Sequence, residues 1–563
     1  MSDIGVRTVG GHKEVGASMV AATETILSQS SSGTSIDGVN GRICSPVDGG
    51  ESGGYKFRRV ASKMVVSFSS QDPENPVNWS MRKKLFVLTS GVLGVLNGTL
   101  GSSLPSGAVL YIARDFGIEG SEQLALPISM FLIGYVVGPI ICGSLSEAYG
   151  RKPIIVGGFM GFMAFTLACA VCQNWASLLV LRLLVGVVAS APVAVVGGLF
   201  ADIHDDPRER GRVMAYFMAA TTIGPVAAPF ISGYVAVVSW RWAFWVGLIF
   251  AGITLPFVVF MPETYAPILL QRRAKKLRQE TGNNNIVAPI DLEKRDLKAT
   301  LTVTLTRPIR MLVYESIVLF SCLYLAMVYA IFFLFFQAYP VIFQGIYHMS
   351  PGESGLTYLM IGGGAFISLG IFLWWDSILY KAKARGASWA AVEEYRRLPL
   401  ACLGGPLYVI ALFWLGWTAK PEIHWVIPAL SGIPFGMGFL LIFMAILNYI
   451  SDAYETFSAS AQSAASCTRS IFGAALPIAA VPMFNKLGPN WSCSLLAFCS
   501  LVMSVIPFTY IKYGTRIRAN SKFCQHLKEL KEQRRREEED EARRDRAKND
   551  EKALSLDAVE KVP

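Results

Sequence analysis

A short run in the first third of the 563-residue chain places an acid, two bases and two glycines at close spacing. The run reads Gly143-Ser-Leu-Ser-Glu147-Ala-Tyr-Gly150-Arg151-Lys152. Glycine permits a tight turn, and an acid and a base four residues apart can bind neighbouring helix ends through their charges. A simple topological anchor would explain the basic residues but not the spacing of the glycines and the acid. We therefore expect this turn to bind other helices.

A single arginine, Arg182, lies between two long uncharged windows, 153–181 and 183–201. A charge near the middle of a membrane helix costs at least about 2.5–3.5 kcal/mol on insertion scales, so it is a functional candidate by default. The alternative is an arginine that extends to the membrane surface, because the expected turn at Asn174 is close in sequence.

Two prolines stand four residues apart in the run Gly224-Pro225-Val-Ala-Ala-Pro229-Phe-Ile-Ser-Gly233. Each proline removes a backbone donor from a helix and favours a kink. The small residues around them allow close approach of neighbouring helices. One proline is common in membrane helices, so the paired spacing, not the kink alone, singles this segment out.

Aromatic residues crowd a later window, where Tyr329, Phe332 and Phe336 share one face at helical spacing. Packing between helices or contact with lipid would explain the rings. Neither explains Gln337, whose amide needs a hydrogen-bonding partner. Sparse polar groups among aromatic rings are typical of a pocket for an apolar ligand.

These residues are carried by long apolar segments. The chain is 52 % hydrophobic and only 16 % charged, whereas about a quarter of a soluble protein is charged. A spanning helix needs about 20 apolar residues, and spanning strands are only about 10 residues long and alternate. The sequence therefore predicts an all-α membrane protein with twelve transmembrane helices. The twelve windows, the eleventh interrupted only by Arg469, are 85–113, 123–146, 153–181, 183–201, 213–240, 242–262, 316–352, 354–375, 398–419, 423–451, 456–485 and 487–511.

Lys and Arg are concentrated on one side of these windows, which by the positive-inside rule predicts that both termini are cytoplasmic. The net charge of +10 is thus a topology signal and does not indicate nucleic-acid binding. The start has no apolar core of a signal peptide, so we expect no cleaved leader. The expected domains are a disordered tail (1–80), a six-helix half (81–267), a cytoplasmic linker (268–309), a second six-helix half (310–513) and a charged tail (514–563).

The turn at 143–152 resembles the signature loop of the major facilitator superfamily, whose two halves face each other across a central cavity. The resemblance implies that Glu147 caps a helix of the opposite half and that Arg151 pairs with Asp202, an acid at the end of the fourth span. Gly143, Gly150 and Lys152 complete this latch. By the same resemblance Arg182 serves proton coupling. The run with Gly224, Pro225, Pro229 and Gly233 resembles the antiporter signature and implies export.

From about Asn75 to Lys512 the chain is similar to the fungal branch of the twelve-span drug:proton antiporters. Asn448 and Arg469 belong to the motifs that carry this similarity, and we expect them to line the substrate cavity with Tyr329, Phe332, Phe336 and Gln337. The resemblance implies export of an amphipathic, neutral or weakly anionic organic compound, driven by the proton gradient without cofactor or metal. The expected partners are a small-molecule substrate and the lipid bilayer, with no nucleic acid, in a monomer of the plasma membrane. A vacuolar or vesicle membrane is the alternative location.

Other functions are less consistent with the residues. The chain has no G-x-x-x-x-G-K-[ST] run for an ATP-driven pump, and its five histidines are too scattered for an enzyme's catalytic or metal cluster. Within transport the alternatives are a polyamine exporter and an uptake symporter. No Asp or Glu lies in the middle of an apolar window, which disfavours multivalent cations. It also means that proton coupling is implied by the resemblance and not by a buried carboxylate.

Overall fold

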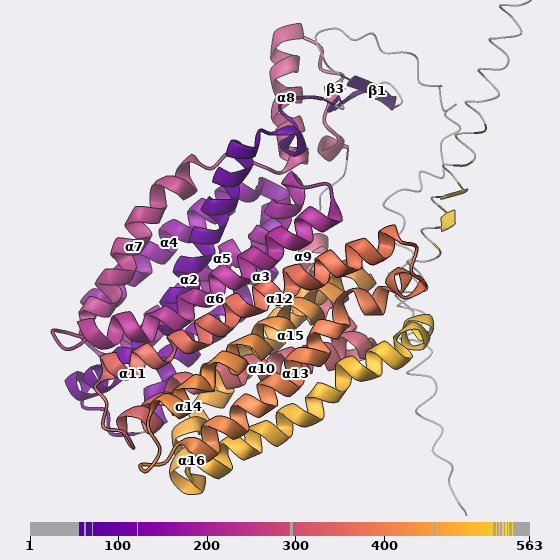
Figure 1. The fold of residues 1–563 in the computed structure, drawn as a ribbon. Coiled ribbons are helices and arrows are strands. Elements are labelled where there is room, and N and C mark those ends of the chain that lie inside the picture. Colours follow the sequence, from indigo (N-terminus) through magenta and orange to yellow (C-terminus); the bar gives the residue numbers. More distant parts are fainter. Residues whose placement is uncertain are drawn as a thin grey trace, which may run out of the picture.

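The computed structural model describes residues 56–60, 63–69, 71–120, 122–292, 297–454 and 457–521, and isolated positions between 525 and 543. Most of both expected tails therefore lies outside the described residues. Figure 1 shows long helices running side by side, with a small unit standing beyond one end of the bundle.

The first half contains α2 (Met81–Phe116), α3 (Leu126–Tyr149), α4 (Arg151–Val171), α5 (Trp175–Ile203), α6 (Pro207–Val235) and α7 (Arg241–Phe260). Between the halves lie α8 (Ala266–Thr281) and α9 (Leu297–Tyr314). The second half contains α10 (Ser316–Tyr339), α11 (Pro351–Thr357), α12 (Leu359–Ala384), α13 (Glu393–Thr418), α14 (Val426–Leu430), α15 (Gly432–Tyr454) and α16 (Ser458–Asn520). Short turns are η1 (Pro76–Asn78), η2 (Gln123–Ala125), η3 (Pro289–Asp291), η4 (Pro340–Gln344) and η5 (Ser388–Ala391).

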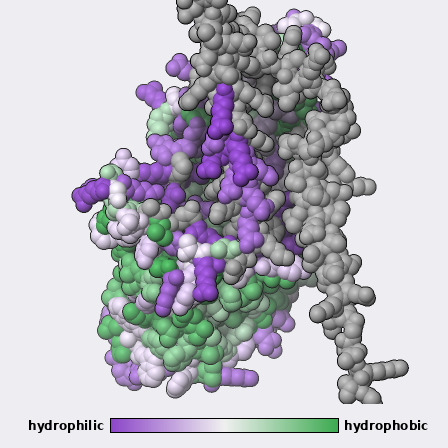
Figure 2. Space-filling model, turned by 90° about the vertical axis from the view of Figure 1, so that its right-hand side faces the viewer, coloured by the Kyte–Doolittle hydropathy of each residue, from purple (hydrophilic) through white to green (hydrophobic). Residues whose placement is uncertain are grey.

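Among the described residues, eleven helical segments are long and apolar enough to cross a membrane. The last of them, α16, contains Gly488 with φ 73° and ψ 165°, a backbone conformation that ends a helix and that glycine adopts readily. Figure 1 shows α16 turning back on itself, so it supplies two spans and the total is twelve. The predicted number of spans is thus present. On the face that Figure 2 shows, hydrophobic residues cover much of the lower part of the molecule and hydrophilic residues gather above them.

We call the end of the bundle that carries Arg151, Arg208 and Lys381 the basic end, and the other the far end. The halves touch near both. At the basic end Arg208 of α6 pairs with Asp376 of α12. At the far end the Gln337 amide donates to the Leu124 carbonyl over 3.4 Å.

The small unit is a three-stranded sheet packed on α8. β1 (Lys56–Val60) pairs antiparallel with β2 (Lys63–Ser67), which pairs parallel with β3 (Ile286–Val287). Its own hydrophobic core contains Val66, Ile268, Leu270, Ala274, Leu277, Ile286, Ala288 and Ile290. The structure differs here from the predicted disordered tail, because residues 63–69 and 71–80 are ordered against the linker. The linker itself is largely helical.

A buried ion pair fastens this unit. Arg273 Nη1 of α8 lies 2.5 Å from Asp72 Oδ2, and Arg273 Nε lies 3.3 Å from Glu74 Oε2. Burial alone would raise the pKa of the Asp72 carboxyl, but hydrogen bonds from Arg273 and from the Glu74 backbone N–H hold the pKa below its usual value. Asp72 is therefore ionised at neutral pH and ties the segment before α2 to the helix after α7.

Candidate functional site

The turn between α3 and α4 is built around Gly150. Its φ of 102° is a conformation that residues with a Cβ rarely adopt. A Cβ at this position would also lie only 2.5 Å from Glu263 Oε2. Gly150 therefore allows α4 to begin directly against a carboxylate.

Glu263, just after α7, collects four backbone N–H groups. Its Oε1 accepts from Arg151 N (2.9 Å), Thr264 N (3.0 Å) and Tyr265 N (3.0 Å), and its Oε2 accepts from Lys152 N (3.2 Å). The side chain is only 4 % exposed. A carboxylate at a helix N-terminus satisfies orphan donors and interacts favourably with the helix dipole. Sequence analysis did not identify this residue; an acid directly after the last apolar window of the first half was the available signal.

Arg151 and Asp202 form an ion pair, with Arg151 Nε 3.2 Å from Asp202 Oδ2. Arg151 Nη1 also donates to Ser146 Oγ over 2.7 Å, and its guanidinium carbon lies 4.6 Å from the Tyr265 ring centre. Asp202 accepts a second hydrogen bond from Thr264 Oγ1. The pair thus joins α4, α5 and the segment after α7 within one half. That it acts as a latch stays a prediction.

The other predicted latch residues, Glu147, Gly143 and Lys152, have positions that do not explain a latch role. Glu147 is exposed on α3 near the basic end, and its capping role stays a prediction. A Cβ at Gly143 would meet nothing within 4 Å, so packing does not explain this glycine. Lys152 contributes its backbone N–H to Glu263, as described above.

The second half repeats the arrangement. Arg397 Nε, near the start of α13, lies 3.3 Å from Asp452 Oδ2, near the end of α15. Between the halves, Asp376 accepts from Arg208 Nε at 3.1 Å and from Arg212 Nε at 2.9 Å. A cleft of about 440 Å³ opens beside this network, and its lining includes Arg208, Trp375, Asp376, Tyr380, Lys383, Arg396 and Arg397.

Arg182 is 1 % exposed and does not extend to the membrane surface. Its Nε donates to the Pro127 carbonyl, Nη1 to Gly101 and Nη2 to Ser102, each over 2.8 Å. These acceptors belong to α3 and α2, so Arg182 of α5 joins three helices of one half. Backbone carbonyls cannot take up or release a proton. The contacts of Arg182 therefore explain how the three helices pack but do not by themselves provide a proton carrier. The predicted role in proton coupling stays a prediction.

The proline-containing helix α6 is continuous. Pro225 lacks an N–H, which frees the carbonyl of Thr221 four residues earlier. Thr99 Oγ1 of α2 donates to that carbonyl over 3.3 Å. A Cβ at Gly224 would lie 2.5 Å from the same Thr99 hydroxyl, and one at Gly233 would lie 2.5 Å from the Pro351 carbonyl. The motif therefore sets the contact of α6 with α2 and with α11 of the other half.

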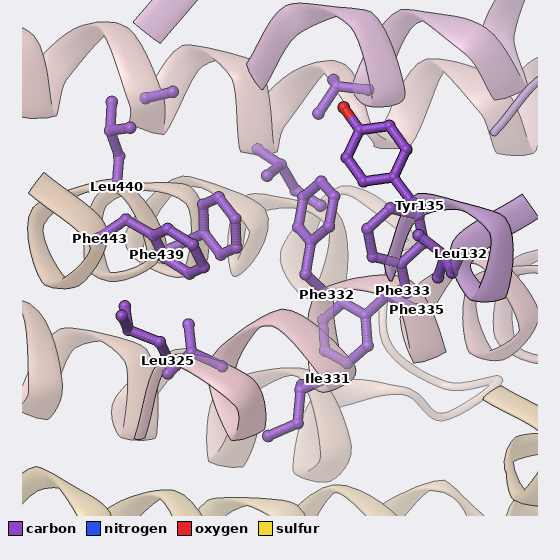
Figure 3. Packing of buried hydrophobic residues seen from close by; sticks show 14 of the residues in the cluster. Leu132, Tyr135, Leu325, Ile331, Phe332, Phe333, Phe335, Phe439, Leu440 and Phe443 are labelled. Atoms are coloured by element: carbon purple, nitrogen blue, oxygen red, sulfur yellow. The ribbon is translucent and has the colours of Figure 1, made fainter. Parts of the chain in front are cut away.

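The predicted cavity residues separate into three groups. Phe332 and Phe336 are buried in ring packing, with centroid distances of 4.6 Å from Phe332 to Phe439 and 5.4 Å from Phe336 to Tyr358. Phe332, Phe333 and Phe439 belong to one buried hydrophobic cluster with Tyr135 of α3, which comes from the other half (Figure 3). Gln337 is buried and its amide bridges the halves at the far end, and its place in the cavity lining stays a prediction.

The remaining three, Tyr329, Asn448 and Arg469, are half-buried. The Arg469 guanidinium carbon lies 5.5 Å from the Tyr329 ring centre and 5.9 Å from that of Phe443. The Asn448 amide donates to the Met444 carbonyl of its own helix. Tyr135 of α3, which the sequence analysis did not single out, is buried, and its ring centre lies 5.6 Å from that of Phe131. Among the described residues, no three His, Cys, Asp or Glu side chains come together as a metal site.

Comparisons with known proteins all lead to one fold and to one class of protein, membrane transporters. The family profile described as Major Facilitator Superfamily matches residues 91–477. The "Major facilitator superfamily multidrug transporter mdrA" of Aspergillus fumigatus is 35 % identical over 463 residues, covering 82 % of this chain and 76 % of that protein. The "Efflux pump FUB11" of Gibberella moniliformis is 37 % identical over 464 residues, covering 82 % of this chain and 77 % of that protein. The "MFS transporter prlG" of a fungal species is 39 % identical over 460 residues, covering 79 % and 94 %.

Solved structures show the same fold at low identity. The xylose transporter XylE of E. coli, in a partially occluded inward-open conformation, gives a TM-score of 0.53 at 15 % identity and covers 76 % of this chain and 99 % of that one. The human organic anion transporter MFSD10 gives a TM-score of 0.52 at 18 % identity and covers 75 % and 99 %. The predicted fold, twelve helices in two six-helix halves, is confirmed.

Proposed function

This chain belongs to the major facilitator superfamily, among its fungal efflux transporters, and on that premise we propose that it exports amphipathic, neutral or weakly anionic organic compounds in exchange for protons. It is a membrane-spanning transporter and not an enzyme.

The observation that supports this substrate class is the charge inside the apolar windows, which is a guanidinium and not a carboxylate. The rings of Tyr329 and Phe443 face a guanidinium, that of Arg469, and the apolar windows hold no Asp or Glu. A multivalent cation would have to leave water without a carboxylate to replace its hydration, which is costly. Aromatic surfaces with few polar groups suit a largely apolar organic compound instead.

Two further observations support the mechanism. The contact of α6 with α11, made through Gly233, joins the halves at the far end, and the Asp376 network joins them at the basic end. Transport requires these contacts to break in turn, so that the cavity opens to one side at a time. Protons would drive the cycle by binding one conformation more tightly than the other.

The test uses inverted membrane vesicles loaded acid-inside and given labelled compounds. We expect uptake of aromatic, amphipathic compounds that stops when an uncoupler collapses the gradient. Uptake that continues unchanged without the gradient would overturn proton coupling. A clear preference for spermine over aromatic compounds would overturn the substrate class in favour of polyamine export.

Orientation is tested separately by cysteine labelling in intact cells. We propose that the basic end and the small unit are cytoplasmic, as the positive-inside rule predicts, in the plasma membrane. A cysteine at Ile118 or Gln344, both at the far end, should react with an impermeant reagent. A cysteine at Asn283 in the small unit should react only after permeabilisation, and labelling there in intact cells would contradict this topology.

A further inference from the structure

Arg469 has hydrogen-bonding capacity that the described residues leave unused. It lies eleven residues into α16, about 16 Å from the basic end of that helix at 1.5 Å per residue. This is roughly half the thickness of a bilayer's hydrocarbon core. Its Nη2 makes a long hydrogen bond, 3.3 Å, to Ser466 Oγ. Its Nε is buried and has no hydrogen-bond partner among the described residues.

The comparison with Arg182 shows why this matters. Arg182 is enclosed, and each of its three nitrogens donates to a carbonyl at 2.8 Å. Arg469 is half-buried, forms no ion pair with a described carboxylate, and faces two aromatic rings. Cation–π contacts contribute about 0.5–1 kcal/mol at exposed sites and about 2 kcal/mol or more when desolvated, but they do not satisfy the N–H donors of the guanidinium. The Nε–H of Arg469 therefore remains able to donate to the acceptor of a bound molecule.

The walls around Arg469 come from both halves. Tyr329 belongs to α10 and Phe443 to α15, and the first half contributes Leu132 of α3, whose Cδ1 would lie 3.4 Å from a Cβ at Gly473. The Tyr329 and Phe443 ring centres are 6.1 Å apart. Gly473, one turn beyond Arg469, gives the Tyr329 ring its place, because a Cβ there would come within 2.9 Å of Tyr329 Cδ1. The arrangement is one cation against an aromatic wall, at the interface that must open during transport.

We propose that Arg469 binds the carboxylate of an aromatic monoanionic substrate, whose flat body lies against Tyr329 and Phe443. The guanidinium presents Nε and Nη in the fork that matches a carboxylate. A single cation balances one negative charge and not two, which favours a monocarboxylate over a phosphate or a dicarboxylate. This inference rests on the proposed export function and narrows its substrate class from neutral or weakly anionic compounds to organic acids.

The experiment measures binding of two probes of nearly equal shape, 2-naphthoate and 2-naphthamide, to the purified full-length protein at neutral pH. We expect wild type to bind the acid more tightly than the amide. Arg469→Gln should weaken the acid at least about tenfold, because a buried charge pair loses one partner, and should change the amide by less than about threefold. Arg469→Lys should keep a preference for the acid, because the charge remains, with reduced affinity because the fork is lost.

The matched control is Arg241→Gln at the far end, where Arg241 pairs with Asp115; both affinities should remain at the wild-type value. Equal weakening of acid and amide by Arg469→Gln would show a purely structural role and overturn the proposal. An equal wild-type affinity for both probes, or no binding of either to folded protein, would also overturn it. If Arg469→Gln does not fold, the ratio of acid to amide affinity in Arg469→Lys is used instead. A preference for the acid supports the proposal, and equal affinities overturn it. If wild-type vesicles show no gradient-driven uptake of any compound tested, the proposed export function is overturned instead.

Discussion

Glu263 allows the sharpest prediction about the basic end. In wild type the two carboxylate oxygens of Glu263 accept from the backbone N–H groups of Arg151 and Lys152. In Glu263→Gln one of these oxygens is replaced by an NH₂ group, which cannot accept, so one of the two backbone N–H groups loses its acceptor. One charge-assisted hydrogen bond is worth about 1.5–3 kcal/mol, and the lost charge at the α4 N-terminus adds about 0.3–1 kcal/mol. Together we expect the local free energy of opening at this turn to fall by about 2–4 kcal/mol.

Hydrogen exchange in nanodiscs measures this quantity directly. Because each 1.4 kcal/mol is about a factor of ten, exchange at the amides of Arg151 and Lys152 should accelerate roughly thirty-fold to a thousand-fold. The control is Glu209→Gln, an exposed acid in the first turn of α6, where we expect only the dipole contribution of about 0.3–1 kcal/mol. Exchange in Glu263→Gln that stays within about threefold of wild type, or equal effects of the two substitutions, would refute the reasoning.

Three further predictions concern other contacts. Arg151→Ala and Asp202→Ala should each abolish export while leaving protein in the membrane, and the exchange Arg151→Asp with Asp202→Arg should restore part of it; full export by both single variants would mean that these charges serve topology alone. Gly224→Ala should reduce export and lower the melting temperature, because the new Cβ would lie 2.5 Å from a hydroxyl of α2, whereas Gly252→Ala, whose Cβ meets nothing within 4 Å, should change neither. Because the pKa of Asp72 is lowered on folding, its stabilisation of the small unit is present above about pH 4, its unfolded range, and is lost as pH falls through the lower folded value; exchange over residues 64–80 should rise on acidification, and Asp72→Asn should raise it already at pH 7 and remove that pH dependence.

Hydropathy and charge identify the spans because membrane insertion depends on properties that add along the sequence. The contacts between spans do not add in this way. Asp202 was a candidate partner of Arg151 through a resemblance, yet the role of Glu263 depends on how α7 ends beside α4, more than 100 positions away from the turn in sequence. Arg182 carried the expected burial, but three carbonyls were not foreseeable acceptors, since backbone groups carry no residue-specific signal.

The small unit was missed for a different reason. Its elements are short, and each is only partly apolar, so neither a long hydrophobic window nor a low-complexity segment describes it. Leu270, Ala274 and Leu277 do recur at the spacing of one helical face, and Met64-Val65-Val66 is typical of a strand. Those signals become informative only when the two segments, 200 positions apart, are seen to share the Asp72–Arg273 pair.

The small unit also changes what the linker between the halves can do mechanically. Residues 71–80 lead into α2 and α8 follows α7, so the unit closes the first half into a ring whose start and end are fastened together. Most of the long segment between the halves belongs to the small unit or to α9, and only positions 293–296 separate Leu292 from α9. Five residue steps reach at most about 18 Å. The connection is therefore a short tether with a limited reach, anchored at one end in the first half's own ring and at the other in α9, which packs on α10 and α16 and also contacts α3. Any rotation of the halves must stay within that reach or open the ring.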